Sequence, residues 1–174
     1  MRPEIFVSYS HRDSDLVVPI VALLRASEAL VFRDADQLIP GKKWRQQLDS
    51  AISDSTTVLV FWCDHSRSSE EVKKEYTAAI QQRKDLLPLL LDSTPLPDEL
   101  AEYQYIDFRA AFPKGHAPPM MEAKRARRNM DGTLGGGAPV FPVFVESPTT
   151  SQQIMLAETI ESELLKRTGS TNKI

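Results

Sequence analysis

The fold of this chain is indicated most directly by residues 57–76, which read TVLVFWCDHSRSSEEVKKEY. The first six are threonine, valine, leucine or aromatic residues, a composition typical of a strand that is buried on both faces. Residues 68–76 predict the start of a helix, because Ser68 and Glu71 have the spacing of a capping box and acidic residues fill the first turn. A buried strand followed by a helix is typical of a parallel α/β sheet.

One carboxylate of this helix has an unusual position. At 100° per residue, the apolar stripe contains Val72, Tyr76, Ala79 and Ile80. Glu75 lies only about 60° from Val72 and about 40° from Ala79. Open α/β sheets bind ligands near the starts of helices that follow strands. We therefore expect Glu75 to face a ligand site at the rim of the sheet, and a solvated helix glutamate is the alternative interpretation.

The alternation of strands and helices extends over most of the chain. Strands are predicted at residues 5–9, 30–33, 57–62, 86–91 and 105–108. Helices are predicted at 16–29, 44–52, from 69 to about 83, and 150–166. Pro88 indicates that one side of its strand is unpaired or irregular. The pattern predicts an α/β fold of the flavodoxin-like class, a three-layer sandwich with a five-stranded parallel sheet.

The length and composition predict one domain. The chain has 174 residues, and we expect residues 1–174 to form a single domain with a Pro/Gly-rich insertion at about 113–148, before the last helix. With 41% hydrophobic residues, 26% charged residues and a net charge of -3, we expect no nucleic-acid partner. No apolar run approaches the roughly 20 residues of a membrane span, so we expect no membrane partner. The single cysteine, Cys63, excludes an internal disulfide and favours a cytoplasmic location.

Several segments resemble those of Toll/interleukin-1 receptor (TIR) domains, and they occur in the order and spacing of that family. The likeness covers Ile5 to about Arg109 and extends to the last helix. Residues 5–10, with Asp13 and Asp15, resemble the opening strand and loop of the family. Residues 31–34 with 38–42 resemble its second strand and the loop that follows. Residues 69–75 are similar to the segment that holds the glutamate of NAD-cleaving TIR enzymes.

The resemblance implies an NAD+ glycohydrolase that acts in a defence or signalling pathway. Such an enzyme cleaves the nicotinamide–ribose bond and releases nicotinamide with ADP-ribose or a cyclic ADP-ribose product; NAD is the substrate, and no further cofactor is expected. Glu75 is the implied catalytic residue, since a carboxylate stabilises the oxocarbenium character of the ribosyl centre. Self-association with other TIR domains is expected to activate the enzyme. The implied substrate-binding residues are Tyr9, Ser10, His11, Asp36, Gly41, Lys42 and Ser69.

One position departs from the family pattern and keeps a second function open. TIR enzymes commonly have a tryptophan four residues before the glutamate, and this chain has Glu71 there. The departure slightly favours a non-enzymatic TIR adaptor that acts only by binding other TIR domains, whereas the retained Glu75 argues against it. A nucleoside deoxyribosyltransferase-like enzyme, which uses similar glutamate chemistry, is a more distant alternative. An exposed loop histidine is the other interpretation of His11, and a turn or capping residue that of Asp36.

No metal site is predicted from the sequence, because the three histidines are scattered and none has the spacing of a ligand pair. Cys63 stands beside Asp64 and His65, a combination that superficially resembles an activated nucleophile. Adjacent residues of one loop do not form a catalytic triad, so we expect Cys63 to be a buried or inert thiol.

Overall fold

The protein is described here by a computed structural model, which covers residues 4–26, 31–33, 44–111 and 149–170. All strands of the described residues form one parallel sheet of order β2-β1-β3-β4-β5. These strands are β1 (Glu4–Ser8), β2 (Val31–Arg33), β3 (Thr57–Trp62), β4 (Asp85–Leu90) and β5 (Ile106–Asp107). This is the 2-1-3-4-5 order of doubly wound, flavodoxin-like sheets, and it confirms the predicted α/β class and parallel sheet.

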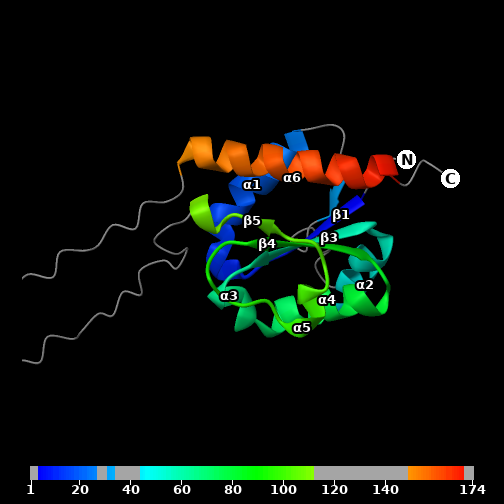
Figure 1. The fold of residues 1–174 in the computed structure, drawn as a ribbon. Helices are drawn as coiled ribbons and strands as arrows, with labels where there is room; N and C mark the ends of the chain where they lie inside the picture. Colours follow the sequence, from blue (N-terminus) through cyan, green and yellow to red (C-terminus); the bar gives the residue numbers. More distant parts are fainter. Residues whose placement is uncertain (1–3, 27–30, 34–43, 112–148, 171–174) are drawn as a thin grey trace, which may run out of the picture.

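Helices cover both faces of the sheet (Figure 1). The upper face in the figure carries α1 (Ser14–Ala26) and α6 (Thr150–Ser170), which pack on each other. The lower face carries α2 (Trp44–Asp54) and α4 (Glu70–Gln81), with the short helices α3 (Asp64–Arg67) and α5 (Asp98–Ala101). Two single 3-10 turns, η1 (His11–Asp13) and η3 (Arg109–Ala111), follow β1 and β5.

The strands divide the core into two apolar clusters, because successive side chains of a strand point to opposite faces. In β1, Ile5 and Val7 belong to the cluster under α1 and α6, whereas Phe6 belongs to the cluster under α2 and α4. Ser8 continues the series of Phe6 and is fully buried. The last residue of β1 therefore directs its hydroxyl toward the α4 side.

The pairing of β4 explains how the sheet accommodates Pro88. β4 pairs with β3 over its whole length, with Pro88 opposite Val60. It pairs with β5 only at Leu89 and Leu90. At Pro88, the edge of β4 that faces β5 thus has no described partner strand. This suits a proline, which has no N–H to donate to a neighbouring strand.

The structure differs from the sequence prediction mainly in short elements. Helix α1 begins at Ser14, two residues before the predicted start, and α6 continues to Ser170. Helices α3 and α5 have four residues each, too few to give a periodic pattern, and they were not predicted. The predicted insertion at about 113–148 lies outside the described residues. Within the described part of the chain, no helix combines the length and apolarity that crossing a bilayer requires.

Candidate functional site

Glu75 is a buried carboxylic acid at the carboxyl edge of the sheet. Helix α4 places its side chain over the end of β1, and the residue is only 7% exposed. The hydroxyl of Ser8 donates a hydrogen bond of 2.5 Å to Glu75 Oε2. Sixty-seven residues separate the two partners in the sequence, so the contact exists only because α4 packs on β1. This geometry is not that of a solvated helix glutamate.

Helix α4 begins after a serine cap. Ser69 is the N-cap residue, and its hydroxyl accepts the N–H of Val72 at 3.4 Å. The capping box predicted from Ser68 was therefore one residue too early: Ser68 ends α3, where its hydroxyl donates to the Asp64 carbonyl. Glu71 lies in the first turn and its Oε2 accepts from Ser69 Oγ at 3.3 Å.

Burial controls the ionisation of Glu75. Removal from water raises the pKa of its carboxyl from 4.5 to about 7, because the charged form loses its hydration. The hydrogen bond from Ser8 opposes this effect and lowers the pKa, since it stabilises the carboxylate. The negative charge of nearby Glu71 raises the pKa further. The carboxyl consequently changes charge near neutral pH, a property that structural surface glutamates lack.

The residues after Ser8 take separate positions. Tyr9 is half-buried and packs against the apolar cluster under α1 and α6, on the face of the sheet opposite Glu75. Its ring also meets the exposed His11 ring edge-to-face, with centroids 6.1 Å apart. Ser10 is buried and caps η1, where its hydroxyl accepts the N–H of Arg12. Ser8 is thus the residue of β1 that donates to Glu75, whereas Ser10 and His11 contact their own turn and Tyr9.

The remaining predicted site residues are the cap of α4 and three residues that the structure does not describe. Ser69 is half-buried and acts as the cap described above. Asp36, Gly41 and Lys42 lie outside the described residues. On the α4 side of the sheet, Trp62 packs edge-to-face on Tyr76, with ring centroids 6.2 Å apart. Its indole N–H donates to the Pro95 carbonyl at 3.1 Å, so this tryptophan is a core residue.

Ser8, the partner of Glu75, was not among the residues predicted from the sequence. A signal was present, because a serine that follows Phe6 by two residues points to the same face of a strand. The resemblance drew attention to the loop after the strand instead. The serine is fully buried, and a buried hydroxyl needs a hydrogen-bond partner.

A second polar cluster lies beside the ends of β1 and β3. It joins Asp13 of η1 to Cys63, which follows β3, and to His65 of α3. The thiol of Cys63 donates to Asp13 Oδ2 at 3.0 Å, and His65 Nδ1 lies 2.6 Å from Asp13 Oδ1. The prediction of a buried thiol is confirmed, since Cys63 is 2% exposed. Burial, followed by the hydrogen bond to Asp13 and its negative charge, raises the pKa of the thiol from 9.0 to about 12.

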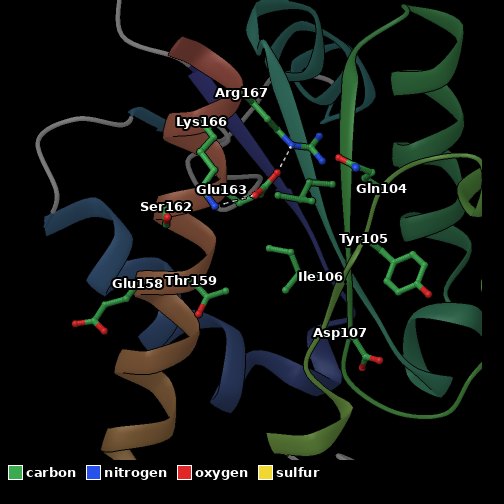
Figure 2. Close-up of a pocket in the computed structure, with 11 residues that line it drawn as sticks. Gln104, Tyr105, Ile106, Asp107, Glu158, Thr159, Ser162, Glu163, Lys166 and Arg167 are labelled. Carbon is green, nitrogen blue, oxygen red and sulfur yellow. Dashed lines mark hydrogen bonds and ion pairs between the residues drawn. The ribbon is translucent and has the colours of Figure 1, made fainter. Parts of the chain in front are cut away.

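A pocket of about 650 Å³ lies between α6 and β5 (Figure 2). It is on the α1–α6 side of the sheet, opposite the face that carries α4 and Glu75. Its basic groups have acidic partners: Arg167 Nη1 is 2.8 Å from Oδ1 of Asp85, which is not a lining residue, and Lys166 and Arg167 both approach Glu163. The pocket therefore does not contain the candidate catalytic residue, and its paired charges assign no ligand class to it.

Comparisons with known proteins identify the fold independently. The family profile described as TIR domain matches residues 5–117, which is more than half of the chain. Among solved structures, the TIR domain of the Toll-related receptor TRR-2 from Hydra magnipapillata is similar, with a TM-score of 0.55 and 18% identity over 60% of this chain and 83% of that one. The TIR domains of the activated Roq1 resistosome, which directly recognises the pathogen effector XopQ, give a TM-score of 0.46 and 20% identity over 53% of this chain and 60% of that one. Among curated proteins, no sequence matched the chain.

Proposed function

Because this chain belongs to the TIR domain family, we propose that it is an NAD+ glycohydrolase with Glu75 as its catalytic residue. The observation that carries the proposal is the burial of this carboxyl beside Ser8, at the edge where parallel sheets bind ligands. The enzyme cleaves the nicotinamide–ribose bond in a defence or signalling pathway. It releases nicotinamide with ADP-ribose, or with a cyclic ADP-ribose when a group of the same molecule replaces water as the acceptor.

The role of Glu75 follows from the charge that develops in this reaction. Nicotinamide leaves as a neutral molecule from a cationic pyridinium, so no acid is needed to protonate it. The ribosyl centre gains oxocarbenium character, and a carboxylate stabilises that positive charge in a site with little water. Only the ionised form of Glu75 provides this stabilisation, and its pKa of about 7 predicts activity that rises through neutral pH.

Ser8 is the positioning residue of this proposal. Its hydroxyl donates to Glu75 Oε2, and in this proposal Oε1 is the oxygen that contacts the ribose. The same hydrogen bond favours the ionised carboxyl. Tyr9, Ser10, His11, Asp36, Gly41, Lys42 and Ser69 remain the proposed substrate-binding residues. Tyr9 and Ser10 have structural contacts of their own. We therefore expect His11 and residues 36–42 to make most of the substrate contacts among these residues.

Self-association is the proposed means of activation. The loop that contains Gly41 completes the pocket of a second copy, so a single copy in dilute solution has little activity. We place the enzyme in the cytoplasm, because one cysteine in 174 residues fits a reducing compartment. Concentrating the protein on a scaffold is expected to raise NAD+ consumption per molecule.

The decisive experiment measures nicotinamide release by chromatography from the 174-residue chain, concentrated on beads, with NAD+ as substrate. Glu75→Gln keeps the shape of the side chain and removes its charge, and we expect it to lower turnover by about 10²-fold or more. Glu70→Gln is the matched control, since Glu70 is an exposed glutamate in the first turn of the same helix. Equal turnover by the wild type and Glu75→Gln would remove Glu75 from the mechanism.

A non-enzymatic TIR adaptor is the second candidate, and Glu71 favours it. At the position of the family tryptophan, this exposed glutamate provides no ring to form a pocket wall. An adaptor predicts self-association, measured by light scattering, without nicotinamide release at any protein concentration. Nicotinamide release that depends on Glu75 excludes this candidate.

A further inference from the structure

The side chains of Asp13, Cys63 and His65 converge although they come from three separate elements. Their donor atoms all lie within 4.8 Å of one another. Asp13 ends the η1 turn after β1, whereas Cys63 and His65 flank the start of α3 after β3. β1 and β3 are neighbours in the sheet, so their carboxyl ends bring the two turns together. The proposed NAD+ chemistry uses none of these three residues.

The chemistry of the three donors is that of a transition-metal site. A thiolate sulfur, an imidazole nitrogen and a carboxylate oxygen are the ligand types of Zn²⁺, and three protein ligands leave a fourth tetrahedral position for water. The thiolate disfavours Mg²⁺ and Ca²⁺, which take oxygen ligands. In the described residues, no other group of three or more such side chains lies close enough to hold a metal ion.

The distances fit a site that closes on a metal with small movements. Ligands at 2.0–2.3 Å from a tetrahedral Zn²⁺ lie roughly 3.3–3.8 Å apart. The observed separations are 3.0 Å between Cys63 Sγ and Asp13 Oδ2, and 2.6 Å between His65 Nδ1 and Asp13 Oδ1. The two pairs that include Asp13, one to each of its carboxylate oxygens, thus need to open by about 1 Å or less. The three donor atoms, one from each residue, all lie within 4.8 Å of one another. The His65 side chain is 13% exposed whereas that of Asp13 is fully buried, so the imidazole forms the outer side of the cluster.

We propose that Asp13, Cys63 and His65 form a binding site for one Zn²⁺ ion. The metal replaces the hydrogen bonds that now hold the cluster together. The Cys63 thiol proton leaves to solvent, and His65 binds as a neutral ring through Nδ1 with its proton on Nε2. Three protein–metal bonds then connect the same side chains, and water occupies the remaining position. The site is independent of the proposed NAD+ chemistry, since it stands on other residues.

The place of the site indicates a structural role. It links η1, which connects β1 to α1, with α3, which precedes the Glu75 helix. A metal that binds only the folded protein raises its apparent stability by RT ln(1 + [L]/Kd), where [L] is the free metal concentration. We therefore expect Zn²⁺ to raise the Tm of the protein by several degrees and to leave Glu75→Gln equally responsive.

The test uses the full 174-residue chain without an affinity tag, stripped with EDTA and dialysed. Titration calorimetry with Zn²⁺ is expected to give one equivalent, with no competition from millimolar Mg²⁺. With Co²⁺ as the probe, we expect the visible bands of tetrahedral cobalt and a near-ultraviolet thiolate-to-cobalt band. Cys63→Ser is expected to abolish the near-ultraviolet band, and His65→Ala to weaken Zn²⁺ binding by about 100-fold or more.

His11→Ala is the matched control for His65→Ala, because His11 is an exposed histidine of η1, the turn that also contains Asp13. It is expected to bind one Zn²⁺ with wild-type affinity. Circular dichroism shows whether each variant folds, and the more exposed His65 provides a variant that spares the buried thiol. Absence of a stoichiometric Zn²⁺ site in the wild type, or unchanged binding in folded His65→Ala, would overturn the proposal.

Discussion

Two buried acidic groups flank the carboxyl ends of β1 and β3, and their hydrogen bonds act on ionisation in opposite directions. Glu75 accepts a hydrogen bond from the Ser8 hydroxyl, and this bond offsets part of the effect of burial on its pKa. Cys63 donates its own proton to Asp13, and this bond adds to the effect of burial. The results are a carboxyl with a pKa of about 7 and a thiol with a pKa of about 12.

The comparison shows that burial sets the direction of the pKa shift in both groups. The hydrogen-bond partner then opposes or adds to that shift, and so decides whether the group is ionised near neutral pH. With a pKa of about 7, a large fraction of Glu75 is ionised near neutral pH, and the ionised form is the one that the proposed electrostatic role uses. Cys63 stays protonated, so the thiol is no nucleophile without a positive charge beside it. In our proposal a Zn²⁺ ion supplies that charge at the second cluster.

The largest expected effect concerns the reactivity of Cys63 in the metal-free protein. A pKa of about 12 instead of 9.0 lowers the thiolate fraction at neutral pH by roughly 10³-fold. Ellman's reagent with EDTA present should therefore label folded Cys63 at least about 10³-fold more slowly than the unfolded chain. Asp13→Asn removes a negative charge beside the thiol and should speed labelling of the folded protein. Labelling of the native wild type at the rate of the unfolded chain would contradict this difference between the two clusters.

The second prediction concerns how Glu75 couples stability to pH. Its pKa is raised on folding, so its contribution to stability is fully present below pH 4.5 and is lost as the pH rises to about 7. The shift corresponds to about 3 kcal/mol in the free energy of unfolding. Urea denaturation of the wild type and Glu75→Gln, each at pH 4.5 and pH 8, isolates this term from the other carboxyl groups. Parallel pH dependence of the two proteins would show that Glu75 titrates normally.

Ser8→Ala should have the third largest effect. It leaves the buried carboxylate without its hydroxyl donor, which costs about 2 kcal/mol at pH 8.5, where Glu75 is ionised. The same change should move the acidic limb of the NAD+ cleavage profile to higher pH, because the opposing effect of the hydrogen bond is lost. Ser8→Thr, which keeps the hydroxyl, should restore the limb toward its wild-type position. If the acidic limb of the pH profile stays in place in Ser8→Ala, this hydrogen bond does not influence the ionisation of Glu75.

Glu71→Gln should have the smallest effect. The charge of Glu71 is the last of the three influences on the Glu75 pKa, and it raises that pKa. Its removal should lower the pKa slightly and shift the acidic limb toward lower pH, opposite to Ser8→Ala. Since the interaction is between charges and Glu71 is exposed, 1 M salt should produce a similar shift in the wild type. A shift to higher pH in Glu71→Gln would reverse the assigned sign.

The sequence by itself determined the long elements and the parallel sheet. The apolar run of β3 and the helical spacing of α4 are properties of consecutive residues, so they were legible without tertiary contacts. The position of Glu75 at the margin of an apolar stripe could be predicted for the same reason. Capping was predicted one residue early, because Ser68 and Ser69 are both acceptable caps and only the presence of α3 selects the second.

Only the tertiary structure decided which side chains meet. Ser8 and Glu75 are 67 residues apart in the chain, and Cys63 and Asp13 are 50 residues apart. Cys63 is followed in the sequence by Asp64 and His65, whereas its acidic partner in the fold is Asp13, in the turn after the neighbouring strand β1. A pKa depends on burial and on such distant partners, since desolvation and hydrogen bonding are properties of the folded surroundings. Local periodicity therefore fixed where the acids lie along each element, and the packing of α4 and η1 on the sheet decided their chemistry.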